Sequence, residues 1–273
     1  MTSAWRLLIT PPAEGAWNMA VDEAILEAVS SAQSLPTLRL YAWDPPCLSL
    51  GYAQPIADVD PARLAQYGWH LVRRPTGGRA ILHTDELTYA VIASLQDPLV
   101  AGSVLESYAR ISRGLLAALE RLSLAPRADH KYDLPEGTSP RGPVCFEVPS
   151  NYEITVEGKK LVGSAQARRK NGVLQHGTLP LYGDLTRITL ALAAPDELAR
   201  LADAQRLLNH AATVESILGY PVTWEQAAQA MASAFRDTLG LELQPCPLTP
   251  AELQRALELQ NDKYAHPSWT HRV

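Results

Sequence analysis

A β-hairpin pattern between residues 151 and 166 constrains the fold of this chain more than any other feature. A first strand leads into the turn Glu157-Gly158, and a second strand begins with Lys159-Lys160 and reaches Gly163-Ser164-Ala165. Successive side chains of a strand point to opposite faces of its sheet, so the two lysines cannot share one cleft. The pattern therefore predicts one lysine in a cleft of the protein and the other in solvent.

Cys145 lies just before this hairpin, at the end of a segment from Ala125 to Val144 that is rich in proline, glycine and charge. We interpret that segment as a surface loop, and loops on a rigid scaffold often carry reactive groups. A cysteine thiolate beside a cationic lysine is the arrangement that acyl transfer through a covalent intermediate requires. A single cysteine is more often a small buried hydrophobic residue, so the residues alone leave catalysis open.

A second motif follows the predicted strand His70–Arg74 and ends at His83. Its paired glycines, Gly77-Gly78, can turn backbone N–H groups toward one point and bind an anion or a polarised oxygen, with Arg73, Arg74 and Arg79 around them. The spacing matches neither a Walker A nor a dinucleotide-binding motif. A plain hairpin turn and a ligand loop are equally compatible with these residues.

Composition narrows the class of protein. The 273 residues are 47% hydrophobic, which is enough for a sizeable core, and the formal charge of -5 argues against a nucleic-acid binder. The three cysteines form no Cys-x-x-Cys or Cys/His cluster, so neither a zinc site nor a disulfide framework is expected. No targeting segment and no apolar run of ~18 residues is visible, so we expect a cytoplasmic protein without membrane contact.

The remaining patterns indicate an α/β chain. They predict a helix at 18–29 with Asn18 as its N-cap, a strand at 86–94, and amphipathic helices at 103–124 and 223–239. His176 lies in a further strand at 173–181 and is either a cleft residue or an ordinary polar residue at a strand crossing. From Pro195 onward the pattern is helical.

Both motifs together resemble the lipoate/biotin protein ligase and octanoyltransferase superfamily. The resemblance rests on RRPTGGRA from Arg73, GKKLVGSAQ from Gly158, and Gln175-His176-Gly177. Within the superfamily the chain is most similar to the LipM-type octanoyltransferase branch. That likeness rests on Cys145-Phe146, Pro149-Ser150, Tyr152-Glu153, Lys263-Tyr264-Ala265 and Trp269.

The resemblance implies one α/β (α+β) catalytic domain over residues 1–273, with a mixed, largely antiparallel sheet flanked by helices and a helical C-terminal portion at 195–273. It assigns Lys160 as the active-site lysine and Cys145 as the acyl-carrying cysteine. The substrate-binding residues that it implies are Arg73, Arg74, Thr76, Gly77, Gly78, Arg79, His83, Gly163, Ser164, Ala165, Gln175, His176 and Gly177.

The implied reaction moves an octanoyl group from acyl carrier protein, through a Cys145 thioester, to a lysine of a lipoyl domain in lipoate biosynthesis. The expected acceptor is the glycine-cleavage H protein or a 2-oxoacid dehydrogenase E2 subunit, and no cofactor or metal is needed. Three alternatives stay open. They are an ATP-dependent lipoate–protein ligase, which would use ATP and Mg²⁺, an amidotransferase acting between lipoyl domains, and a non-catalytic binder of lipoyl domains.

Overall fold

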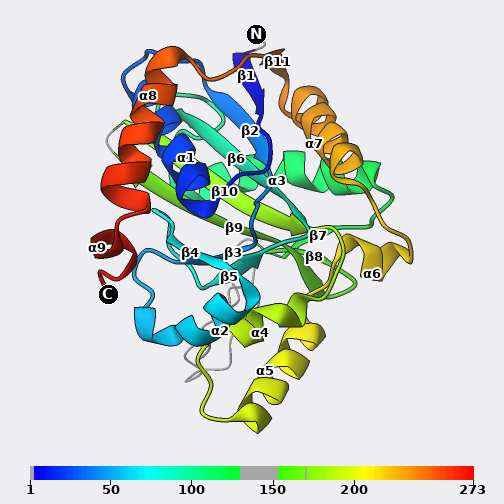
Figure 1. Ribbon diagram of the computed structural model, residues 1–273. Coiled ribbons are helices and arrows are strands. Elements are labelled where there is room, and N and C mark those ends of the chain that lie inside the picture. The colour runs from blue at the N-terminus through cyan, green and yellow to red at the C-terminus, as the bar shows by residue number, and fades with distance from the viewer. Residues whose placement is uncertain (1–2, 130–152, 170) are drawn as a thin grey trace.

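A large sheet forms the centre of the protein (Figure 1). The computed structural model describes residues 3–129, 153–169 and 171–273. In spatial order the strands are β11 (Leu241–Pro245), β1 (Ser3–Ile9), β2 (Thr37–Tyr41), β6 (Glu86–Ser94), β10 (Gly172–Pro180), β9 (Lys159–Arg169), β8 (Glu153–Val156) and β7 (Arg127–Asp129). Strand β1 runs parallel to β2 and β11, and the other described neighbours are antiparallel. The predicted mixed, largely antiparallel sheet is confirmed.

A second, smaller sheet lies against one end of the large one. Its order is β4 (His70–Arg73), β3 (Cys47–Leu50) and β5 (Ile81–His83), with β3 parallel to β4 and antiparallel to β5. The sequence patterns gave no sign that these strands form a sheet of their own. The boundary between the two sheets is where the candidate site lies.

Helix α1 (Gly15–Ser30) covers one face of the large sheet, and α8 (Pro250–Leu259), the π-helical turn η4 (Gln260–Tyr264) and α9 (Pro267–Thr270) pack beside it (Figure 1). The apolar residues Met19 and Ile25 anchor this layer. The predicted cap of α1 is wrong, because the helix begins at Gly15. The Asn18 amide instead donates to the carbonyls of Ala13 and Ala42, at 3.0 Å each, and fastens α1 to the end of β2.

Helices α3 (Val104–Arg121) and α7 (Trp224–Leu239) cover the opposite face and pack on each other. Both were predicted, and both begin with a capping box in which the Ser103 or Thr223 side chain bonds the first helical turn. Their inner faces place Ile111, Leu115 and Phe235 in the largest apolar core.

Short elements surround the small sheet. They are η1 (Ile56–Asp58), α2 (Pro61–Tyr67), η3 (Leu185–Arg187), α4 (Ile188–Ala191) and α5 (Glu197–His210), with α6 (Val214–Leu218) following. A third apolar cluster joins them to the small sheet, with Leu48, Ile188 and Leu207 among its members. None of the described helices is both long and apolar enough to cross a membrane.

Two expectations about the chain path need correction. Residues 127–129 form strand β7, although the whole of 125–144 was predicted as a loop. Residues 241–245 form β11, although everything after 195 was predicted to be helical. Both strands are short and lie at the edges of the sheet, where pairing with β8 or β1, and not a local pattern, fixes the strand.

Candidate active site

A narrow slot opens between the large and the small sheet. It encloses about 360 Å³ of empty space, part of it open to solvent, and its exposed lining is mostly carbon. One wall comes from β9 and β10, and the facing wall comes from the small sheet. The lining residues are Met19, Tyr41, Trp43, Ser49, Arg74, Ile81, His83, Thr88, Gly163, Ser164, Ala165, His176, Gly177 and Thr178.

The β9–β10 wall is built from small residues. Gly163, Ser164 and Ala165 lie opposite Thr178, Gly177 and His176 in antiparallel register. A Cβ atom on Gly177 would lie less than 3 Å from the carbonyl oxygen of Gly163 and 2.7 Å from a Tyr89 ring carbon. The strands therefore leave no room for a side chain at Gly177, while the His176 and Thr178 side chains on either side of it line the slot.

Lys160 lies three residues before Gly163 on β9, roughly 10 Å along the strand. Its Nζ donates to Glu153 Oε1 at 2.7 Å, and both side chains are buried. A bulge between Ile154 and Thr155 lets Glu153, on the paired strand, reach this position. Lys159 is exposed, as the alternation of a strand requires, and the turn between the strands has positive φ at Glu157 and Gly158.

Cys145 lies outside the described residues, as does the rest of 130–152. The two described cysteines differ from each other. Cys47 is fully buried at the start of β3, where burial raises the pKa of its thiol and keeps it protonated. Cys246 is exposed. Cys47 is therefore a core residue.

His176 is held on both ring nitrogens. Its Nδ1 lies 3.2 Å from Asp22 Oδ2, and its Nε2 lies 2.7 Å from Thr76 Oγ1. Asp22 also accepts from Arg39 at 2.6 Å and from the Tyr41 hydroxyl at 3.0 Å. A sequence-predicted loop residue, Thr76, and a strand residue, His176, therefore meet at the slot.

The charges around Asp22 and His176 indicate which ring nitrogen of His176 carries the hydrogen. Burial opposes ionisation of Asp22, but Arg39 and the His176 hydrogen bond outweigh it, so the pKa of Asp22 lies below its usual value. Burial lowers the pKa of His176 despite the neighbouring carboxylate. A neutral imidazole beside an ionised carboxylate carries its hydrogen on Nδ1, and Nε2 accepts from Thr76.

His83 forms a second carboxylate–imidazole group on the facing wall. Its Nδ1 lies 2.6 Å from Glu86 Oε1, and its Nε2 lies 2.8 Å from Ser49 Oγ. The Trp43 ring stacks on the imidazole with centroids 3.8 Å apart. Burial alone would raise the pKa of Glu86, but His83 and hydrogen-bonding threonines, Thr88 among them, hold it below its usual value.

The two adjacent arginines have different structural roles. Arg74 lines the slot, where it donates to Ser49 Oγ at 3.1 Å and to the carbonyls of Gly77 and Arg79 at 2.8 and 2.7 Å. It therefore fixes the shape of the glycine loop.

Arg73 is fully buried and turned away, with its donors on carbonyls of Gly51, Gln54 and Thr270 at 2.6–3.0 Å. It ties the small sheet to the C-terminal turn.

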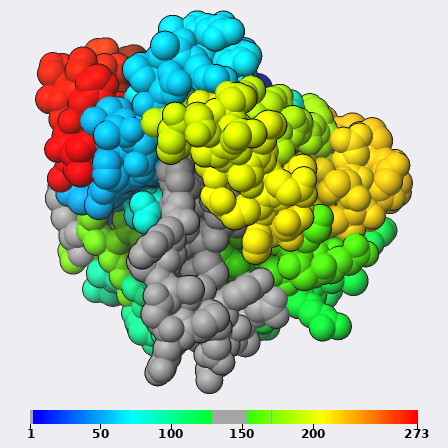
Figure 2. Space-filling model, turned by 90° about the horizontal axis from the view of Figure 1, so that it is seen from below, coloured from blue at the N-terminus to red at the C-terminus, as the bar shows by residue number. Residues whose placement is uncertain are grey.

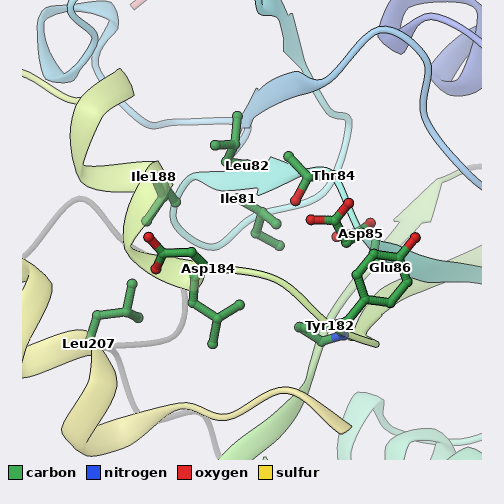
Figure 3. A pocket seen from close by; sticks show the side chains of 11 residues that line it. Ile81, Leu82, Thr84, Asp85, Glu86, Tyr182, Asp184, Ile188 and Leu207 are labelled. Atoms are coloured by element: carbon green, nitrogen blue, oxygen red, sulfur yellow. The ribbon is translucent and has the colours of Figure 1, made fainter. Parts of the chain in front are cut away.

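A second pocket of about 450 Å³ lies beyond Ile81, which lines both spaces, and Glu86 lines this second pocket while bonding to His83 on the slot side. Figure 3 shows Asp85, Glu86 and Tyr182 gathered on one side, with Ile188 and Leu207 across from them. Asp85 is paired with Arg187. The His83–Glu86 group therefore forms part of the partition between the slot and this pocket.

The structure brings together many of the residues predicted to bind substrate. Arg74, His83, Gly163, Ser164, Ala165, His176 and Gly177 line the slot, and Thr76 bonds to one of them. Gln175 points its amide at the Tyr89 hydroxyl instead, and Arg73, Gly77, Gly78 and Arg79 are not among the lining residues.

Sequence reasoning missed four residues that organise the site. They are Asp22, Ser49, Glu86 and Glu153. Glu153 lies on the strand paired with that of Lys160, but Thr155 is the residue directly opposite Lys160, and the bulge brings the Glu153 carboxylate to the lysine. The other three depend on contacts between distant segments. Among the described residues, no group of three or more His, Cys, Asp or Glu side chains could hold a metal ion.

The sequence matches a known family model over most of its length. Residues 14–236 match the lipoyl protein ligase A/B catalytic domain. Similar curated proteins include the octanoyltransferase LipM of Kyrpidia tusciae, 42% identical with 98% of each chain covered. Those of Symbiobacterium thermophilum and Bacillus subtilis are 39% and 36% identical, with 100% and 98% of each chain covered.

Solved structures of lipoate protein ligases are similar to this chain over nearly its whole length. The bipartite lipoate protein ligase of Thermoplasma acidophilum superposes with a TM-score of 0.80 at 25% identity, covering 99% of this chain and 96% of that one. A lipoate-protein ligase A bound with ATP gives a TM-score of 0.79 at 25% identity, with 99% of each chain covered. The similarity therefore extends over the slot and both of its walls.

Proposed function

Because the chain belongs to the lipoyl protein ligase A/B catalytic-domain family, we propose that it is an octanoyltransferase of lipoate biosynthesis that delivers its acyl group to a lipoyl domain. The observation that carries the proposal is the joint placement of Lys160 and the slot. A buried, carboxylate-paired lysine lies three residues from the small-residue wall of a mostly carbon-lined cavity.

The acyl donor that we propose is an octanoyl thioester of acyl carrier protein. The Cys145 thiolate attacks the thioester carbonyl, and the carrier thiol leaves with a proton from the Lys160 ammonium. The acceptor lysine amine then attacks the acyl-cysteine and gives its proton back to Lys160, and the Cys145 thiolate leaves. Glu153 holds the Lys160 nitrogen in place through both steps. Backbone N–H groups of Gly77-Gly78 or Gly163-Ser164 are the proposed oxyanion donors.

The slot suits the octanoyl tail. Each CH₂ group that leaves water contributes about 0.8 kcal/mol, so the tail supplies several kcal/mol of binding. The polar atoms of His83, Ser49 and Arg74 bond to one another, and the surface left for the tail is mainly carbon.

No nucleotide is required in this proposal. Exchange between thioesters is nearly balanced, and transfer from a thioester to an amine is downhill. A free acid would first need activation with ATP and Mg²⁺, which is the route of a lipoate–protein ligase. A ligase is the second candidate, because a related solved structure at 25% identity is described with bound ATP. We also propose a cytoplasmic location, with the H protein or an E2 subunit as acceptor.

Intact-mass measurement tests the proposal. Mixing the protein with octanoyl-acyl carrier protein and no nucleotide should give an octanoyl adduct that base or hydroxylamine removes. The adduct should be absent in Cys145→Ser and retained in Cys47→Ala, the buried control. An adduct that forms only after free octanoate, ATP and Mg²⁺ are added would establish the ligase instead.

A further inference from the structure

Helix α5 carries an exposed row of leucines that no described part of the protein covers. Leu198, Leu201 and Leu208 are 78%, 61% and 42% exposed. At 100° per residue they lie within about 80° of the helix surface and so form one stripe. Single exposed apolar residues are common, but three on one helix face indicate a contact surface.

The opposite side of the same helix is firmly anchored. Leu207 is 1% exposed and belongs to the core beside the small sheet. Arg200 is buried and donates to the carbonyls of Thr189 and, at 2.9 Å, Leu192. The outward direction of the leucine stripe is therefore set by packing and not by a loosely placed helix.

The end of α5 is bonded to the hairpin that carries Lys160. The exposed Lys159 donates from Nζ to the Leu208 carbonyl at 2.8 Å. Just after the helix, Ala211 bridges to Lys160, and the Ala212 amide donates to the Lys160 carbonyl at 3.1 Å. Figure 2 shows this part of the chain, in yellow-green, on the surface of the molecule. The leucine stripe thus borders the place where the acyl group is transferred.

We propose that the leucine stripe of α5 docks the acceptor lipoyl domain, an inference that rests on the proposed function. The acceptor must bring a lysine amine to the neighbourhood of Lys160, and a lysine side chain is much shorter than α5, which spans about 21 Å. The body of the acceptor must therefore rest on surfaces adjoining the hairpin. The donor carries its acyl group on a long prosthetic arm, so its body is not held to the same distance.

The size and charge of the surface fit a transient partner. Three leucines cover only part of the roughly 800 Å² that each side of a stable interface buries, which argues against a permanent dimer through this helix. Lys159 places a cation at the active-site end of the stripe. The complementary face of the acceptor would carry an apolar patch that covers the leucines and, beside its target lysine, a carboxylate that pairs with Lys159.

A charge placed in the stripe tests the proposal. Leu201→Glu should weaken binding of an apo lipoyl domain about tenfold in calorimetry, because a carboxylate would be buried in an apolar contact. Leu257→Glu is the matched control, since Leu257 is a 44% exposed leucine on a different helix, α8, which packs on α1. In turnover the Leu201 variant should raise KM for the lipoyl domain with little change in kcat. Acyl-enzyme formation without acceptor should be unchanged.

Three results would overturn the inference. Equal acceptor binding by wild type, Leu201→Glu and Leu257→Glu would show that the stripe does not contact the acceptor. Slower acyl-enzyme formation with normal acceptor binding would assign the stripe to the donor. A dimeric wild type that becomes monomeric in Leu201→Glu would assign it to a second copy of the chain. The binding measurement needs no chemistry, so it also separates this inference from a failure of the proposed reaction.

Discussion

The two walls of the slot are built on opposite principles. On β9 and β10, the backbone wall, most lining residues are small, and the strands leave no room for a side chain at Gly177. Across from it, Ser49, His83 and Arg74 turn their polar atoms to one another and present carbon to the slot. The first wall has no room for an added atom at Gly177. The second wall needs the hydrogen bonds among Ser49, His83 and Arg74. The two walls should therefore fail in different ways.

Adding one methyl group should damage the backbone wall most. Gly177→Ala would place Cβ less than 3 Å from the Gly163 carbonyl and 2.7 Å from Tyr89. Neither neighbour can move freely, because both belong to the central sheet, so a loss of about 3 kcal/mol in unfolding free energy is expected. Urea denaturation measures it. Gly77→Ala is the control, since a Cβ at Gly77 meets nothing within 4 Å and should cost little. Similar losses in both variants would contradict the contrast.

Removing one charge should loosen the polar wall. Glu86→Gln takes away the carboxylate that holds His83 Nδ1, and a loss of about 2 kcal/mol is expected for a hydrogen bond to a charged group.

The effect should depend on pH. Because the folded-state pKa of Glu86 is depressed, its contribution is present above the unfolded-state value and is lost as pH falls through the folded one. Stability measured from pH 7 to 3 should therefore fall less in the variant than in wild type. Exposed Glu242→Gln should follow wild type.

The smallest effect is expected at Thr76, which joins the glycine loop to His176. Thr76→Val removes the hydroxyl that donates to Nε2, at a cost of about 1 kcal/mol. In ¹⁵N NMR the Nε2 signal should move while Nδ1, held by Asp22, keeps its hydrogen. Burial keeps the wild-type His176 pKa below its usual value, so at pH 6.5, where an unperturbed histidine is half protonated, the ring should be mostly neutral. An unmoved Nε2 signal would show that Thr76 does not bond to His176.

The backbone wall was largely predictable from the sequence, and the polar wall was not. The Glu157-Gly158 turn and strict alternation predicted one lysine inside and one outside, the family resemblance assigned Lys160 to the site, and the strand at 86–94 was found with its bounds intact. The turn, the alternation and the strand are local properties, set by turn chemistry and the period of a strand. The role of Cys145 stays a prediction, since that residue lies outside the described part.

The hydrogen-bonded groups around the slot depend on contacts between segments that no local pattern connects. Asp22 lies inside the predicted helix at 18–29, where no local pattern marks it, but it is buried and bonded to a histidine 154 residues away. Ser49 is the one polar residue among the apolar residues of β3, and its Oγ lies 2.8 Å from His83 Nε2. Only the packing of the small sheet on the large one brings such partners together.

The hydrogen bonds of Arg73 determine how early in synthesis this part of the protein can reach its final structure. Its guanidinium bonds carbonyls from residues 51 and 54, which leave the ribosome before it, and from Thr270, which emerges 197 residues later. A nascent chain stopped before Thr270 lacks one of the carbonyl groups that hold Arg73. Arg73 is the chain neighbour of Arg74, which fixes the shape of the glycine loop. The slot therefore cannot be completed before Thr270 has left the ribosome.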